Sequence, residues 1–160
     1  MGDRVQLLSD ALELKGRPYV WGAKGPEQFD CSGFVTYLIH RMGGYDWRQT
    51  HNAAALWRDC ESIPEADLHL DDITKGAPLW PCPGVDAGDL AFYGPEGEPD
   101  HVMLVWGDGQ VLGASGGNHH TTSPEIAAQL GACVRFRPRV DYRPDFLGYR
   151  RFPLPVSLEG

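Results

Sequence analysis

The hydrophobic pattern of this chain changes near its middle, and that change is the strongest constraint on its fold. Before residue 60, apolar residues recur at helical spacing, and after residue 88 they lie in short runs of the kind found in strands. Helices followed by strands predict an α+β domain over residues 1–152, with the N-terminal helices packed on an antiparallel sheet of about five strands. Residues 153–160, rich in proline and leucine, are expected to form a C-terminal tail.

Three helices are predicted in the first half of the chain. The first begins at Asp3, which can cap it, and ends at Gly16. Its apolar positions form two adjacent rows, Val5, Leu8 and Leu12 beside Leu7, Ala11 and Leu14. The second helix starts near Asp30, carries a wide apolar stripe and stops at Gly43. A third helical segment is expected over residues 51–59.

The middle and the second half contain the predicted loop and strands. Prolines interrupt residues 60–85, so we expect a long connecting loop there, with at most a short turn of helix, that could wall a substrate groove. Strands are predicted at 89–93, 101–106, 110–114, 132–136 and 146–152, with a helical turn at 124–130. Gly107 to Gly109 would be a three-residue hairpin loop that pairs Gln110 with Trp106.

Composition excludes several classes of function. A net charge of −8 argues against a nucleic-acid partner, because phosphate binding needs a basic face. The sequence has no apolar run of about 18 residues that could span a membrane. The N-terminus lacks the layout of a signal peptide, so we expect synthesis in the cytoplasm without a visible export signal. The four cysteines show no metal-ligand spacing, so neither a metal nor another cofactor is predicted.

One cysteine occupies a chemically favourable position. The run Asp30-Cys31-Ser32-Gly33 places Cys31 in the first turn of the second predicted helix. Unpaired N–H groups and the helix dipole favour a thiolate there, and should lower the cysteine pKa below its usual value of about 8.5. Cys31 is therefore either a nucleophile or an ordinary buried core cysteine. The other three cysteines are expected to be reduced.

A cysteine nucleophile needs a base within hydrogen-bonding reach, usually a histidine. His40 lies more than two helical turns from Cys31, too far to act as its base. His51 and His69 lie in or near polar loops, where they are expected to be solvated. His101 differs because it opens an apolar strand directly after the charged loop 96–100. Strand ends beside loops are where a rigid scaffold presents catalytic groups. His101 is thus a candidate base, or else a residue that merely ends a strand at the surface.

Four short motifs occur in one order along the chain: Tyr19-Val20-Trp21-Gly22, Asp30-Cys31-Ser32-Gly33-Phe34, Gly88-Asp89-Leu90 and His101-Val102. In this the sequence resembles the NlpC-type cysteine peptidases, papain-like hydrolases that cut the stem peptides of bacterial cell-wall peptidoglycan. The resemblance covers roughly residues 5–115. It implies a papain-like NlpC fold in which the cysteine starts a helix and the histidine comes from the sheet.

The resemblance also assigns roles to five residues. It implies that Cys31 is the nucleophile, which forms an acyl-enzyme, and that His101 is the general base. The backbone N–H of Cys31 would help to hold the oxyanion, and Tyr19 would line the site and contribute to the same hole. Asp30 and Ser32 match positions that bind the amine or peptide end of the substrate. From the residues alone, Asp30 could equally be a helix N-cap, and Ser32 a hydroxyl bonded to the backbone.

The sequence departs from the family at one position. Members usually carry a third polar residue, His, Asn or Gln, twelve positions after the catalytic histidine, where it orients the imidazole. Here that position is Gly113. The substitutes that we consider are Ser115, Asn118, His119, His120 or a water molecule. Alternatively, catalysis is weakened and the site serves only for binding.

The sequence therefore predicts a cysteine endopeptidase that hydrolyses peptide bonds in peptidoglycan stem peptides. One alternative is a cell-wall amidase of the related Cys-His amidohydrolase type. Another is a non-catalytic module that grips the cell wall, such as a phage tail component, and Gly113 favours it. Because no export signal is visible, a phage lysin or virion component that acts on the wall would fit the sequence.

Overall fold

The structure, a computed structural model, describes residues 3–155. Within that range the helices are α1 (Asp3–Glu13), α2 (Cys31–Arg41), α3 (Ala53–Asp59), α4 (Pro64–Ile73) and α5 (Pro124–Leu130). The strands are β1 (Leu90–Tyr93), β2 (His101–Gly107), β3 (Gln110–Ser115), β4 (Cys133–Arg137) and β5 (Phe146–Arg150), with a 3₁₀ turn η1 (Val140–Tyr142). The strands form one antiparallel sheet in the order β4-β3-β2-β1-β5. The predicted α+β architecture is confirmed.

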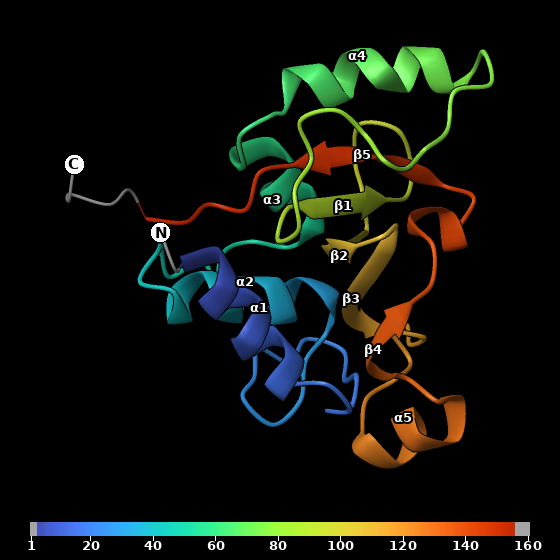
Figure 1. Ribbon diagram of the computed structural model, residues 1–160. Coiled ribbons are helices and arrows are strands. Elements are labelled where there is room, and N and C mark those ends of the chain that lie inside the picture. The colour runs from blue at the N-terminus through green and yellow to red at the C-terminus, as the bar shows by residue number, and fades with distance from the viewer. Residues whose placement is uncertain (1–2, 156–160) are drawn as a thin grey trace.

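Helices cover both faces of the sheet (Figure 1). Strand β2 shows the division, because successive side chains point to opposite faces. Val102 and Leu104 belong to the apolar cluster that includes the α1 and α2 side chains. Met103 and Val105 belong to a second cluster with Ala66 of α4. The sheet is therefore buried on both faces. Among the described residues, no helix is long and apolar enough to cross a membrane.

Helix α1 buries one of its two predicted apolar rows in the core, and of the other row only Leu8 packs against it. Leu7 and Ala11 are fully buried, whereas Val5 is 73% and Leu12 46% exposed. A short helix that touches its neighbours along a single line can bury only a narrow stripe. The sequence could not show which row would face the core.

The prediction of a loop over residues 60–85 was wrong in its first half, because residues 64–73 form α4. Pro64 occupies the first turn, where a missing N–H costs no hydrogen bond, so it starts the helix instead of breaking it. The helix contacts β5 through the second apolar cluster. No residue of 60–85 lines either of the two cavities beside Cys31, so this segment does not wall them.

The β2–β3 hairpin is confirmed, but its loop is shorter than predicted. Gly107 pairs with Gln110, which leaves Asp108 and Gly109 as the turn. Both turn residues have positive φ, 53° and 80°, as a type I′ hairpin turn requires. A register shift beyond the turn then pairs Val105 with Val111.

Asp89, directly before β1, joins the two ends of the described chain to the sheet. Its fully buried carboxylate accepts hydrogen bonds from Arg151 Nη1 at 2.8 Å and, at longer range, from Arg4 Nη1 at 3.4 Å. The backbone N–H groups of Asp86 and Phe152 also donate to it, at 2.9 and 3.4 Å. Burial raises the pKa of Asp89, and the N–H groups and arginines oppose that rise. This carboxylate therefore holds α1 and the C-terminal segment against β1.

Replacing Asp89 by alanine should reduce the free energy of unfolding by about 3 kcal/mol, because it leaves the N–H groups of Asp86 and Phe152 without an acceptor and breaks the ion pair with Arg151. Denaturant titration measures the loss. Asp86→Ala is the matched control, since the Asp86 side chain is 70% exposed and its loss should cost less than about 1 kcal/mol. Equal stability of Asp89→Ala and wild type would contradict the role given to Asp89.

Candidate active site

The Asp30 carboxylate determines where the first turn of α2 lies. One oxygen, Oδ1, accepts from the backbone N–H of Gly33 at 2.6 Å and so caps the helix. The other, Oδ2, accepts from the backbone N–H of Gly22 at 3.0 Å. At Gly33, a Cβ atom would lie 2.0 Å from the carbonyl oxygen of Ala23, so only glycine lets the loop approach this closely. The loop after Tyr19 is thereby held against the start of the helix.

The predicted nucleophile and base are brought to one cavity. Cys31 is the first residue of α2, and His101 is the first residue of β2, paired with Tyr93 at the end of β1. The Cys31 thiol lies 3.7 Å from the carbonyl oxygen of Asp100, the residue before His101. Both side chains line the same cavity of about 290 Å³.

A second cavity, of about 440 Å³, also opens at Cys31. The two cavities share Tyr19, Trp21, Cys31 and Asp100, so the thiol lies between them. The larger one is further lined by Gly22, Lys24, Asp30, Ser32, 52–54, Glu98 and Pro99. The smaller one is completed by His101, Gly117, Asn118, His119 and Arg143. A substrate lying across Cys31 would therefore meet three carboxylates and Lys24 on one side, and Arg143 together with the shared Asp100 on the other.

The three residues predicted to bind substrate all line the larger cavity. Tyr19 lines both cavities, and its ring leaves no room for a side chain at Gly117, where a Cβ would lie 2.3 Å from the ring. The Ser32 hydroxyl donates to Asp30 Oδ1 at 3.3 Å. Asp30 and Ser32 thus form part of the helix cap and also part of the cavity wall.

Burial controls the ionisation of both candidate catalytic groups. It raises the pKa of the Cys31 thiol to about 12, and the Asp30 carboxylate adds to the rise, although the N–H groups of Val102 and Ser32 oppose it. Burial, with a smaller effect from Arg143, lowers the pKa of His101 to about 3. Burial therefore opposes the predicted thiolate, because desolvation outweighs the helix N-terminus. Near neutral pH both groups are uncharged.

Sequence reasoning missed the partner of His101. Its Nε2 atom lies 2.6 Å from the hydroxyl oxygen of Tyr142, in the 3₁₀ turn η1. Tyr142 lies in a stretch with no predicted element, and no local pattern marks it. Only the fold brings it to the end of β2.

The side chains that the sequence offered as substitutes have other partners than His101, although Asn118 and His119 line the same cavity. The Ser115 hydroxyl accepts from Arg137 Nε at 3.1 Å. The Asn118 side chain accepts from the backbone N–H of His120 at 2.8 Å, and the exposed rings of His119 and His120 pack on each other at 3.9 Å.

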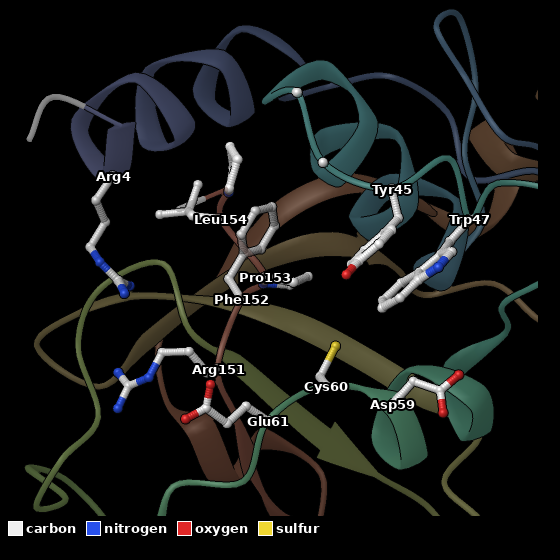
Figure 2. Close-up of a pocket in the computed structure, with 13 residues that line it drawn as sticks. Arg4, Tyr45, Trp47, Asp59, Cys60, Glu61, Arg151, Phe152, Pro153 and Leu154 are labelled. Carbon is white, nitrogen blue, oxygen red and sulfur yellow. The ribbon is translucent and has the colours of Figure 1, made fainter. Parts of the chain in front are cut away.

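A larger cavity, of about 810 Å³, lies away from Cys31 and contains Cys60 (Figure 2). Arg4 and Arg151 lie at one end and the aromatic rings of Tyr45 and Trp47 at the other. Cys60 follows the end of α3, and burial raises the pKa of its thiol to about 12. No histidine lines this cavity, so Cys60 has no base there.

Comparison with known proteins agrees with this arrangement. The model of the NlpC/P60 family matches residues 16–130, which contain Cys31, His101 and most of the sheet. The chain belongs to the NlpC/P60 family.

Individual relatives of this NlpC/P60 chain are considerably longer. It is 30% identical to "Probable endopeptidase p60" of Listeria grayi over 108 residues, 68% of this chain and 17% of that protein. It is 32% identical to "Protein P54" of Enterococcus faecium over 132 residues, 82% of this chain and 20% of that protein. The chain therefore spans about a fifth of the length of these relatives.

Two solved structures of similar size share the fold. The NlpC/p60 domain of the peptidoglycan hydrolase SagA has a TM-score of 0.61 at 25% identity, over 92% of this chain and 97% of that one. The P60 domain of the M. avium subspecies paratuberculosis antigen MAP1204 has a TM-score of 0.60 at 22% identity, over 96% and 98%. They confirm the predicted NlpC-type fold.

Replacing Asp30 by asparagine should lower the pKa of Cys31, because it removes a negative charge and keeps a side chain that can cap α2. Alkylation of Cys31 by iodoacetamide at a fixed neutral pH, followed by peptide mapping, should be roughly 3- to 10-fold faster. Glu27→Gln removes an 83% exposed carboxylate from the preceding loop and is the control. An unchanged or slower rate in Asp30→Asn would contradict the electrostatic role of Asp30.

Proposed function

We propose that this chain is a cysteine endopeptidase that hydrolyses peptide bonds in the stem peptides of bacterial peptidoglycan. The observation that carries the proposal is the meeting of Cys31, at the start of α2, with His101, at the start of β2, in one cavity. Family membership supports the same chemistry, since the similar proteins include a probable endopeptidase of Listeria grayi and the peptidoglycan hydrolase SagA.

The proposed reaction begins with an uncharged thiol and an uncharged imidazole. As Cys31 Sγ attacks the scissile carbonyl carbon, His101 accepts the thiol proton. The carbonyl oxygen becomes an oxyanion. The N–H of Cys31, in the first helical turn where backbone donors have no intrahelical partner, and the Tyr19 hydroxyl would stabilise it. Proton transfer during attack avoids a resting charge pair in a buried site.

The second half of the reaction releases both products. The His101 imidazolium donates its proton to the leaving amine, the C–N bond breaks, and an acyl-enzyme remains on Cys31. A water molecule then attacks the thioester carbonyl while His101 accepts one of its protons. The C–S bond breaks, the thiol regains a proton, and a carboxylate product leaves.

The larger cavity has the charge expected of a site for the amine end of a peptide. Three carboxylates line it, those of Asp30, Glu98 and Asp100, against one ammonium group, that of Lys24. Glu98 and Asp100 are exposed. An ammonium group of a stem peptide bound there would be attracted by these carboxylates. The Ser32 hydroxyl lies in the same wall and is a further candidate contact.

The test is release of peptides from purified peptidoglycan sacculi by wild type and by Cys31→Ala. Wild type should release fragments, and Cys31→Ala should lose at least about 1,000-fold of the rate, since the nucleophile is gone. Cys60→Ala, which removes another buried thiol, is the matched control and should retain activity. Equal release by wild type and Cys31→Ala would refute the proposal.

Mass analysis of the fragments identifies the bond that is cut. Cleavage between two stem-peptide residues supports an endopeptidase. Cleavage between the sugar and the first amino acid would instead establish an amidase. Binding to sacculi without any fragment release would establish a non-catalytic wall-binding module.

The lowered pKa of His101 makes a prediction about acid pH. The imidazole must be neutral to accept the thiol proton, and burial keeps it neutral well below the ordinary histidine pKa of about 6.5. The acid limb of kcat/KM should therefore lie clearly below pH 6.5, within the range where circular dichroism shows the protein folded. An acid limb at or above about pH 6.5 would show that the free enzyme does not bury His101 as described.

A further inference from the structure

We propose that Tyr142 is the positioning residue of the dyad, and that its hydroxyl holds His101 in the tautomer that can deprotonate Cys31. This inference rests on the proposed function. In most family members the residue at the position of Gly113, on β3, orients the imidazole. Here we assign that role to Tyr142 in η1. The carrying observation is the 2.6 Å distance between Tyr142 Oη and His101 Nε2.

The usual position for an orienting side chain is filled by another residue. A Cβ atom built at Gly113 would lie 2.8 Å from the sulfur of Met103. Met103 is fully buried on β2, two residues after His101, in the apolar cluster of that face. A polar side chain at position 113 would therefore have to displace Met103, so the orienting oxygen comes from a different element.

Tyr142 is held firmly enough to orient its partner. The Tyr93 hydroxyl donates to the carbonyl oxygen of Val140 at 2.6 Å and fixes η1 to the end of β1. The Tyr93 ring also packs edge-on against Tyr142, with 5.4 Å between centroids. On another side, the Arg137 guanidinium lies over the Tyr142 ring at 5.0 Å, and the Ser115 hydroxyl fixes that guanidinium. Ser115 is thus linked to Tyr142 through Arg137.

The Tyr142 hydroxyl can support the tautomer that the reaction needs. Burial raises the pKa of Tyr142 to about 12, so its hydroxyl is neutral near neutral pH. Its oxygen can accept a hydrogen bond from His101 Nε2–H. With the proton on Nε2, the other ring nitrogen, Nδ1, has a free lone pair and can take the Cys31 proton. When the imidazolium forms, the same hydroxyl still accepts from Nε2–H and so stabilises the charged ring.

The kinetic test is Tyr142→Phe, which removes one oxygen and keeps the ring between Tyr93 and Arg137. We expect kcat on peptidoglycan fragments to fall roughly 10- to 100-fold with little change in KM, as for other residues that orient a functional histidine. Tyr149→Phe is the matched control, because the buried Tyr149 hydroxyl has no hydrogen-bond partner among the described residues. It should leave kcat unchanged, and thermal unfolding shows whether both variants fold.

The decisive readout does not depend on activity. NMR of the protein with isotope-labelled histidine reports which ring nitrogen of His101 carries the proton. Wild type and Tyr149→Phe should show the Nε2–H form, and Tyr142→Phe a mixture of tautomers. An unchanged His101 spectrum in folded Tyr142→Phe would overturn the inference, whatever the value of kcat. If wild type cuts no peptidoglycan, the proposed function fails, while the spectrum still decides the role of Tyr142.

Discussion

The candidate site depends on one carboxylate that makes contacts in two directions. Asp30 caps α2 through one oxygen and holds the Gly22 N–H through the other, so the helix start and the preceding loop form one rigid unit. Cys31 and Tyr19 are attached to that unit, and their relative position follows from it. The same negative charge raises the Cys31 pKa. Asp30 therefore fixes the position of the thiol although it raises the pKa of that thiol. A fixed position allows the thiol to meet His101, which the sheet holds on the other side of the cavity.

Because the thiol and the imidazole are both buried, the site rests as a neutral pair. In the proposed reaction, charges arise only when the thiol attacks the carbonyl, and donors already in place then stabilise them. This arrangement makes the orientation of His101 more important than its intrinsic basicity. An imidazole with its proton on Nδ1 would have no lone pair on that nitrogen to accept the thiol proton. The contact of Nε2 with Tyr142 is important for this reason.

The chain has the fold and the motifs of the NlpC/P60 family but builds the support of its histidine differently. Met103 fills the space beside Gly113, and the oxygen near His101 comes from η1, a turn between β4 and β5. Tyr93 and Arg137 hold that turn from two strands. The family resemblance therefore points to the two groups that we propose to react, Cys31 and His101. It identifies their support poorly, because a hydroxyl can reach the same point in space from many places in the chain.

The sequence by itself determined the features that depend on neighbours along the chain. The Asp30 cap, Cys31 at the start of α2 and the hairpin after His101 follow from local hydrogen bonding and periodicity. The tertiary structure alone decided that residues 64–73 are helical, that Leu7 and not Val5 faces the core, and that Tyr142 meets His101. It also decided the ionisation of Cys31. Burial and contacts between distant segments control all of these, and neither is encoded in the spacing of nearby residues.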